Sequence, residues 1–446
     1  MTKKFFQYIL ITSFFFVALV FIFTLSRGDT FVNYGFSYAV SRGEIPYLDY
    51  NMVITPFAPF FYSIFLFFCK NILVFYLEQA ILLSVLYFLL GKLLGKKRLL
   101  FLLILLIPYP IAMVSTIFPG YNFLIIFLFF IFIYCFQKKK NSYLLGILLG
   151  LIFCTKQTIG ILLFLPTFYY LFQDRKKFMK MTIGYLLPIL LLVSYLFITN
   201  SFSSFFDLCF LGLFDFGSSN TNINLFYFLL FFIGEGYLIY RIYKDKNNLL
   251  LYYAVLLGSL ILPIIDYYHV SLFLVICFYF WLENITVKEK WYSKIIIMIV
   301  SILVIWSFVS WNYLGGLNIS HFSNFSFVIN RKEYNETSKK LIQYTNSLKK
   351  PVIYFMRGSE NYFYKITRNL KLDYFDLPNQ GNYGYNGVNK MKKKIENVHD
   401  TYFVIDRVLV KNQDSNQQYI KELGQYVVET SKKTQTIGVY DIYYKE

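Results

Sequence analysis

The sequence predicts a polytopic α-helical membrane protein of about eleven transmembrane helices, followed by a small extracellular α/β domain. Hydrophobic residues make up 57% of the chain and charged residues only 15%, whereas about a quarter of the residues in soluble globular proteins are charged. Apolar runs long enough to cross about 30 Å of hydrocarbon recur through residues 1–313. Residues 314–446 are more polar. We therefore expect a membrane domain over 1–313 and a soluble domain over 314–446.

Composition also excludes several classes of function. The net charge of +18 does not indicate nucleic-acid binding, because most basic residues of the membrane half fall in short loops, where they set orientation and meet anionic lipid. The five cysteines lack metal-ligand spacing and none follows residue 277, so neither a zinc site nor a disulfide framework is predicted. No glycine-rich nucleotide-binding loop is present.

The first apolar run, residues 5–25, is expected to be a retained helix that runs outward from the cytoplasm. Lys3 and Lys4 precede it, which indicates a cytoplasmic N-terminus. The run is too long for a signal-peptide core and carries no small-x-small cleavage pattern. The loop that follows, residues 26–73, is then extracellular. Its stretch 56–69 is short and contains two prolines, which favours an interfacial or re-entrant segment over a span.

The remaining spans alternate in direction along the chain. They are predicted over residues 74–94, 99–117, 121–136, 142–155, 158–172, 181–199, 225–243, 249–265, 268–283 and 295–313. The cytoplasmic ends and loops then hold about nineteen basic residues. The outer loops before residue 314 hold four, namely Arg27, Arg42, Lys70 and Lys156. This asymmetry follows the positive-inside rule, and an odd number of spans leaves 314–446 outside the cell.

Acidic residues of the membrane half show the opposite bias. The acids on the predicted outer side are Asp29, Glu44, Asp49, Asp207, Asp215 and Asp266. Acidic residues contribute little to topology, so their distribution needs another cause. A chemical site on the outer face is the economical explanation, and solvated loop acids would give the same pattern.

Asp29 lies at the outer end of the first span, just before a predicted amphipathic helix over residues 31–43. Its apolar side is formed by Val32, Phe36, Ala39 and Val40, and its polar side by Asn33, Ser37 and Ser41. Such a helix suits the bilayer surface and would hold Asp29 at the lipid–water boundary. A carboxylate there can accept a proton from a hydroxyl nucleophile, as a general base does. The alternative is a solvated residue at a helix end.

Several features follow one another in the first quarter of the chain. They are the outward first helix, Asp29, the interfacial helix, Gly43-x-x-Pro46-Tyr47-x-Asp49, and the aromatic stretch after Pro56-x-x-Pro59. This order resembles the membrane-embedded GT-C glycosyltransferases, including the protein mannosyltransferase and lipid A aminoarabinose transferase relatives. Residues 149–160 resemble a second family feature, a Gly-Leu…Thr-Lys turn at the outer end of a helix hairpin. The resemblance covers about residues 1–313.

The resemblance implies an essential acid in the first outer loop and a polyprenyl-phosphate sugar as the donor. Asp29 matches that acid. Some relatives carry Lys before a Pro-Pro pair in this loop, where the chain has Thr55 followed by Pro56 and Pro59. The departure leaves open which residue contacts the lipid phosphate. Arg42 or Lys156 could supply its cation, and Lys156 could instead extend to the interface, as lysines near helix ends do.

Two further groups are candidates for substrate binding. Asp266 and His269 are three residues apart, so they can meet on one helical face and bind sugar hydroxyls or phosphate. The alternative is an interfacial polar cluster in the aromatic belt. Asp49, from the first outer loop, is the second candidate group. No metal site is assigned, although Asp29, Asp49 and Asp266 are hard oxygen ligands that could hold a divalent cation together.

The predicted function is an inverting transfer of a sugar from a polyprenyl-phosphate carrier to an extracytoplasmic acceptor, namely a cell-envelope polysaccharide, lipid or teichoic acid. Glu235 lies inside a span and suggests either an ion path or a helix–helix hydrogen bond. A transporter or flippase for a lipid-linked saccharide is therefore the alternative. A polysaccharide polymerase and a catalytically silent scaffold also remain open.

The soluble tail is expected to be a small α/β domain. Strand-like runs occur at 351–355, 402–405 and 438–443, and helix-compatible stretches at 333–348 and 415–424. Strands alternating with helices are typical of that class. Residues 379–387 are rich in Gly and Asn and are expected to form a flexible loop.

Overall fold

The structure, a computed structural model, describes most of the chain in separate stretches. These are residues 28–95, 120–219, 225–261, 265, 267–284, 317–322, 325–330, 336–356, 364–366, 370–373, 381–411 and 418–446. The chain divides into two compact units. Unit 1 comprises Met1–Thr24, Phe75–Leu192 and Thr221–Leu314, and unit 2 comprises Leu25–Val74, Val193–Asn220 and Gly315–Glu446.

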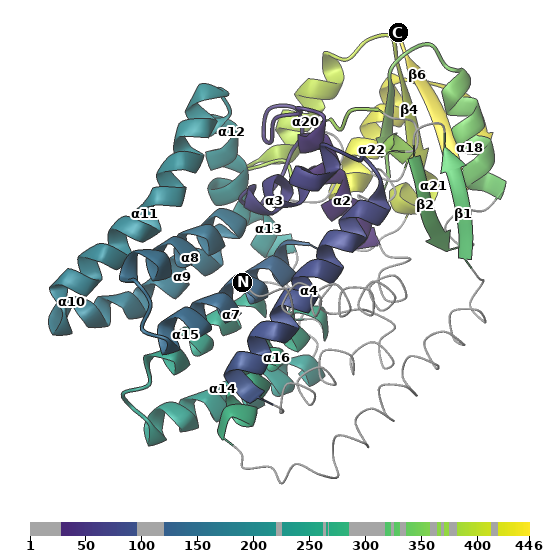
Figure 1. The fold of residues 1–446 in the computed structure, drawn as a ribbon. Helices are drawn as coiled ribbons and strands as arrows, with labels where there is room; N and C mark the ends of the chain where they lie inside the picture. Colours follow the sequence, from purple (N-terminus) through teal and green to yellow (C-terminus); the bar gives the residue numbers. More distant parts are fainter. Residues whose placement is uncertain are drawn as a thin grey trace. The chain divides into compact units, whose positions relative to one another are not determined.

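The helices of unit 1 overlap the apolar runs that were predicted as spans (Figure 1). They are α4 (Ile72–Leu94), α7 (Tyr121–Gln137), α8 (Ser142–Thr155), α9 (Gln157–Phe164), η2 (Leu165–Phe168), α10 (Tyr169–Gln173), α11 (Arg175–Ile198), α14 (Leu225–Lys244), α15 (Leu249–Leu257), η4 (Gly258–Ile261) and α16 (Tyr267–Asn284). The first residues of α4 and the last of α11 belong to unit 2.

Three helices among the described residues are long and apolar enough to cross a membrane: Leu77–Leu94, Arg175–Ile198 and Leu225–Lys244. The protein is therefore mostly helical, with helices suited to a bilayer, and carries a small sheet. The predicted spans 5–25, 99–117 and 295–313 and the predicted domain boundary at residue 313 lie outside the described residues.

The predicted span 158–172 is not one regular α-helix. The α9 helix ends at Phe164 and a 3-10 turn follows, with Pro166 in its first turn. Proline has no backbone N–H to continue an α-helical hydrogen-bond ladder, which accounts for the change. The span predicted over 249–265 changes in the same way at Gly258, where α15 gives way to the 3-10 turn η4.

Glycines bring α8 and α11 into close contact. A Cβ atom at Gly146 would collide with the Met181 carbonyl oxygen, and one at Gly150 would collide with the Tyr185 carbonyl oxygen. On the α11 side, a Cβ at Gly184 would collide with the Tyr143 carbonyl oxygen. Small residues at such positions allow helix backbones to approach closely, which is how helices associate in membranes.

In unit 2, four strands form a mixed sheet in the order β3-β4-β6-β5. The strands are β3 (Val352–Phe355), β4 (Thr401–Asp406), β5 (Lys432–Ile437) and β6 (Tyr440–Lys445). β3 is parallel to β4, and the other two pairings are antiparallel. β1 (Leu317–Phe322) and β2 (Phe325–Asn330) form a separate antiparallel pair.

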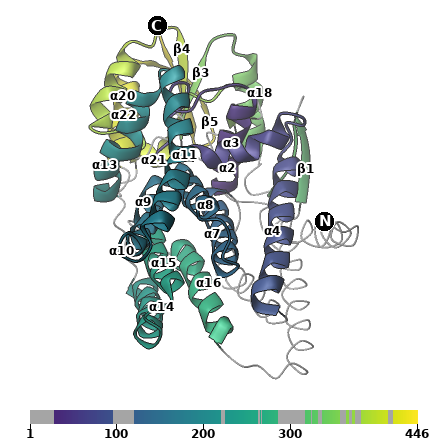
Figure 2. The ribbon, with the colours of Figure 1, turned by 60° about the vertical axis from the view of Figure 1, so that its left-hand side comes forward.

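Helices cover both sides of this sheet. They are α18 (Glu336–Ser347), α20 (Gly387–Glu396), α21 (Arg407–Lys411) and α22 (Gln418–Thr430). Figure 2 shows α20 and α22 on one side of the strands and α18 on the other. The tail therefore has the expected mixture of helices and strands. The predicted strand over 438–443 begins later, at Tyr440, because Gly438 adopts φ +59 in the turn between β5 and β6.

The loop over residues 26–73, which the sequence predicts to face outward and which is called the first outer loop, contains two packed helices, α2 (Gly28–Ser41) and α3 (Phe57–Leu66). Both predicted helices are present, but the polar side of α2 does not face solvent. Ser37 and Ser41 are buried, and their hydroxyls donate to the Asn33 and Tyr38 carbonyl oxygens at 2.9 and 2.7 Å. Because these hydroxyls are satisfied within the helix, burying them costs little.

The middle segment of unit 2 is Val193–Asn220. It contains α12 (Phe202–Phe206), η3 (Asp207–Leu211), which is π-helical, and α13 (Gly212–Ser219). Phe60 of α3 meets Tyr195 edge to face, with ring centroids 5.1 Å apart. Three stretches that are far apart in the sequence therefore share one compact unit.

Candidate functional site in the first outer loop

The loop between α2 and α3 is hydrogen-bonded to the C-terminal part of unit 2. Arg42 Nη1 donates to the Leu370 carbonyl oxygen at 3.0 Å. Leu372 N donates to Glu44 Oε2 at 3.0 Å. Asn51 Nδ2 donates to the Asn382 carbonyl oxygen at 2.6 Å. The first outer loop is thus positioned by residues more than 300 positions later in the chain.

A tight turn shapes residues 43–50 of this loop. Tyr47 adopts φ +69, an unusual value for a residue other than glycine. Its buried hydroxyl donates to the Ile54 carbonyl oxygen at 2.6 Å, and its ring meets Phe205 edge to face. Asp49 Oδ2 accepts a hydrogen bond from Ile45 N at 2.5 Å. The Gly-x-x-Pro-Tyr-x-Asp motif therefore closes on itself, with its tyrosine as the anchor.

The C-terminal loop that contacts this site is held by two acids. Asp207 Oδ1 accepts a hydrogen bond from Tyr385 N at 3.2 Å, and its Oδ2 lies 2.6 Å from Lys390 Nζ. Asp215 Oδ2 accepts a hydrogen bond from Asn386 N at 2.8 Å. The described part of the loop expected to be flexible is thus fastened by hydrogen bonds, and its Tyr383 is buried. Asp207 and Asp215 therefore hold this loop in place.

Three buried side chains of the outer loop carry polar atoms that accept or donate no hydrogen bond among the described residues. These atoms are Glu44 Oε1, Tyr50 OH and Asn51 Oδ1, and the residues are 4%, 0% and 0% exposed. Leaving a buried polar group unsatisfied costs about 1–3 kcal/mol. Such groups in a native fold call for an explanation, such as a bound ligand or an ordered water.

The electrostatics of the loop centre on Glu44. Burial raises the pKa of its carboxyl to about 7, although Arg42 opposes the shift. Arg42 Nε stands 3.6 Å from Glu44 Oε1, and the Arg42 guanidinium lies over the Tyr38 ring. Burial likewise raises the pKa of Tyr50, and the charge of Glu44 adds to that shift. The loop can therefore hold a proton on Glu44 near neutral pH.

The predicted site residues fall in different parts of the structure. Arg42 and Asp49 both belong to this loop. Asp29 lies in the first turn of α2, and its side chain is outside the described residues, as is Asp266.

Two of the predicted residues belong to unit 1. Lys156 sits in the extended break between α8 and α9, with its Nζ 5.9 Å from the centre of the Tyr121 ring. His269 is half-buried near the start of α16. Across the stretches that the structure describes, no group of three or more His, Cys, Asp or Glu residues could hold a metal ion.

Glu44, Tyr50 and Asn51 were not among the site residues predicted from sequence. The only signal was the presence of Glu44 among the outer acids, because burial by the C-terminal part cannot be read from residues 43–51 alone. No family model, curated protein or solved structure matches this chain. The resemblance to GT-C glycosyltransferases therefore rests on the order of the motifs.

Proposed function

We propose that this protein is a membrane glycosyltransferase that moves a sugar from a polyprenyl-phosphate carrier to an extracytoplasmic acceptor, namely a cell-envelope polysaccharide, lipid or teichoic acid. The proposal includes eleven spans, a cytoplasmic N-terminus and an extracellular tail. One observation carries it furthest: Asp29 lies in the first turn of α2, which leads into a loop where three buried polar atoms make no hydrogen bond among the described residues. A sugar offers several hydroxyls that such groups bind.

The proposed chemistry is a single displacement at the anomeric carbon. Asp29 takes the proton of the acceptor hydroxyl as that oxygen attacks the carbon. The bond from this carbon to the phosphate oxygen breaks, and the lipid phosphate leaves with the electron pair. Attack opposite the leaving group inverts the configuration. A phosphate is a good leaving group, so the reaction needs no nucleotide.

The loop residues would orient the sugar rather than react with it. Glu44 and Asn51 offer acceptor oxygens, and Tyr50 offers a hydroxyl that donates or accepts. Arg42 is engaged by Leu370 and Glu44, so its contribution is to hold the loop. The predicted contacts of Lys156, Asp266 and His269 with the donor stay predictions.

The test compares surface glycan composition after acid hydrolysis in the wild type, a gene deletion and Asp29→Asn. Asp245→Asn is the matched control, because Asp245 is an exposed acid that the charge pattern places on the cytoplasmic side. We expect the deletion and Asp29→Asn to lose the same sugar while Asp245→Asn keeps it. If Asp29→Asn, present in the membrane at normal levels, keeps the sugar, Asp29 is not the base.

A transporter for a lipid-linked saccharide is the second candidate, and Glu235 favours it. Glu235 lies within α14, and its Oε2 has no partner among the described residues. Its other oxygen packs against Gly258, where a Cβ would collide with it. A helix–helix contact explains this position without transport. Uptake of a lipid-linked saccharide into vesicles that depends on Glu235 but not on Asp29 would decide for the transporter.

A further inference from the structure

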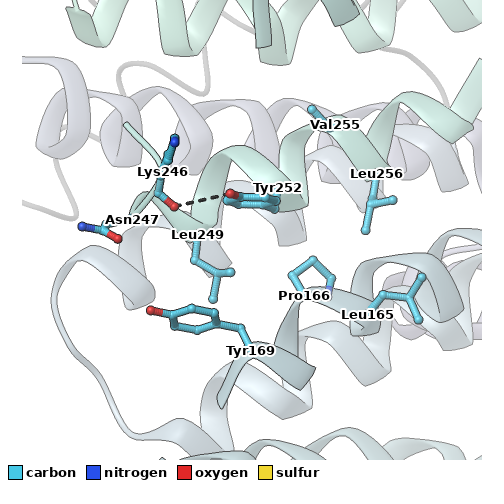
Figure 3. Close-up of a pocket in the computed structure, with 9 residues that line it drawn as sticks. All are labelled: Leu165, Pro166, Tyr169, Lys246, Asn247, Leu249, Tyr252, Val255 and Leu256. Atoms are coloured by element: carbon cyan, nitrogen blue, oxygen red, sulfur yellow. Dashed lines mark hydrogen bonds between the residues drawn. The ribbon is translucent and has the colours of Figure 1, made fainter. Parts of the chain in front are cut away.

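Unit 1 contains an apolar cavity of about 430 Å³. Its walls come from Leu165, Pro166 and Tyr169 on one side and from Leu249, Tyr252 and Leu256 on the other (Figure 3). The volume lies within the range of about 300–1,000 Å³ that is typical of ligand sites. The cavity is thus large enough for part of a ligand, and its lining is almost entirely hydrocarbon and aromatic.

Both walls present apolar surface to whatever fills the cavity. Leu165 and Tyr169 are 47% and 48% exposed, and Tyr252 is also exposed. The Tyr252 hydroxyl donates to the Lys246 carbonyl oxygen at 3.4 Å, which connects the wall to the loop at its edge. A hydrocarbon chain can cover exposed apolar surface between the helices of a membrane protein.

One edge of the cavity is polar and positively charged. Lys246 and Asn247 line it there, and Figure 3 shows the Lys246 amine and the Asn247 amide directed away from the apolar side chains. Lys244 adds a second cation to this loop, and Asp245 is its one acid. Lys246 is exposed, with its Nζ 5.9 Å from the centre of the Tyr243 ring.

The opposite wall also continues into basic residues. Arg175 and Lys176 begin α11, one residue after the end of α10. The nearby acid Asp174 accepts a hydrogen bond from Lys177 N at 3.0 Å and so caps α11. By the charge pattern, both loops lie at the cytoplasmic boundary, where the leaflet is rich in anionic lipid.

We propose that this cavity holds one acyl chain of an anionic phospholipid, whose headgroup contacts Lys246 and Asn247. The apolar walls match the chain, and the basic edge matches the charge of the headgroup. Basic pockets between membrane helices on the cytoplasmic side bind anionic lipid headgroups in this manner. The proposal does not depend on the transferase reaction, since none of these residues belongs to the first outer loop.

The experiment places the full-length protein in phosphatidylcholine nanodiscs with a trace of a phospholipid carrying a photoreactive acyl chain. One probe has a phosphatidylglycerol headgroup and the other a phosphatidylcholine headgroup. Cross-linked peptides are mapped by mass spectrometry. We expect the phosphatidylglycerol probe to label residues 165–169 and 249–256 about fivefold more than the other probe, as one lysine at an anionic headgroup would give.

Three variants separate the effect of the charge at the cavity edge from the effect of the cavity's shape on labelling. Lys246→Glu should abolish the preference for phosphatidylglycerol, and Leu165→Trp should fill the cavity and reduce labelling by both probes. Lys140→Glu is the control, because Lys140 is an exposed lysine of another basic loop that does not line the cavity. Equal labelling by the two probes in the wild type would overturn the proposal. The proposal would also be overturned if polyprenyl phosphate displaced the probe at concentrations at which unlabelled phosphatidylglycerol does not displace it. The occupant of the cavity would then be the sugar carrier.

Discussion

Glu44 Oε2 accepts a hydrogen bond from Leu372 N at 3.0 Å, which joins the first outer loop to a residue 328 positions later. The carboxylate that makes this connection is buried, with Arg42 beside it. Burial raises its pKa to about 7. The attachment of the outer loop to the C-terminal part is therefore made by a group that titrates near neutral pH.

The first prediction concerns the pH dependence of stability. In the unfolded chain Glu44 titrates near 4.5, and in the folded protein near 7. Between these values the unfolded state loses the proton first, so the free energy of unfolding falls as pH rises, by an amount on the order of 3 kcal/mol. The contribution of Glu44 is constant on either side of this window.

Glu44→Gln should remove that dependence while its amide oxygen still accepts from Leu372 N. The thermal unfolding midpoint of the purified full-length protein, compared at pH 5 and pH 8, measures the effect. We expect the wild type to lose stability towards pH 8 and the variant to lose much less. An identical loss in both proteins would show that Glu44 is not the group responsible.

The second prediction separates a ligand-binding hydroxyl from a structural one in the same loop. Tyr50→Phe removes a buried hydroxyl that has no partner among the described residues, so folding should be unchanged or stabilised by about 1 kcal/mol. Tyr47→Phe removes the hydroxyl that donates to the Ile54 carbonyl oxygen and should destabilise by about 1–3 kcal/mol.

The two tyrosine variants also differ in function if the loop binds a sugar. Tyr50→Phe should lower the amount of transferred sugar on the cell surface although the protein is fully stable. Thermal unfolding and surface sugar analysis on the same strains give both quantities. A stable Tyr50→Phe protein with unchanged glycosylation would remove Tyr50 from the site.

The third prediction compares two glycines with similar backbone conformations. Gly43 and Gly384 adopt φ +85 and φ +79, and a Cβ at Gly43 would meet nothing, whereas one at Gly384 would collide with the Asp207 carboxylate. Gly43→Ala should cost about 1–2 kcal/mol from the backbone alone. Gly384→Ala should cost roughly 1–3 kcal/mol more, because the carboxylate that holds Tyr385 N and Lys390 must move.

Denaturant or thermal unfolding of the full-length protein tests this comparison. Asp207→Ala in the Gly384→Ala background should recover part of the additional loss, since the collision is removed. Equal destabilisation by the two single substitutions would mean that the loop has room at Gly384 and is not held closely by Asp207.

The fourth prediction concerns the helices of unit 1. Gly146→Ala should weaken the contact between α8 and α11 by about 1–3 kcal/mol, because the new Cβ would collide with the Met181 carbonyl oxygen. Gly236→Ala is the control, as its Cβ would meet open space, and it should be neutral or stabilising by up to about 1 kcal/mol. Thermal unfolding in detergent compares them, and equal midpoints would contradict the close approach of these helices.

The positions of the helices could largely be predicted from sequence. Apolar runs of the right length and their flanking basic residues predicted helices over 121–136, 142–155 and 268–283, and α7, α8 and α16 correspond to them within a residue or two. Apolar periodicity is a local property, so it can be read without a fold. The strand β5 was missed because Lys432–Ile437 is a polar, mostly exposed edge strand without an apolar pattern.

The candidate site could be predicted only in part from the sequence. Asp29 and the tight Gly-x-x-Pro-Tyr-x-Asp loop could be picked out from sequence, because a rare acid and a turn motif are visible in a short window. The buried groups Glu44, Tyr50 and Asn51 could not. Their burial depends on packing within unit 2, which includes residues from far along the chain.

The sequence by itself determined that this is a helical protein suited to a membrane, with a smaller α/β part at its C-terminal end. Composition, run length and charge placement are properties of short segments, and they were sufficient for that. Only the tertiary structure decided that the first outer loop, residues 193–220 and the tail form one unit. The hydrogen bonds that join them, such as Asn51 to Asn382 and Tyr385 to Asp207, link single polar groups across long separations, and no local pattern encodes which partners meet.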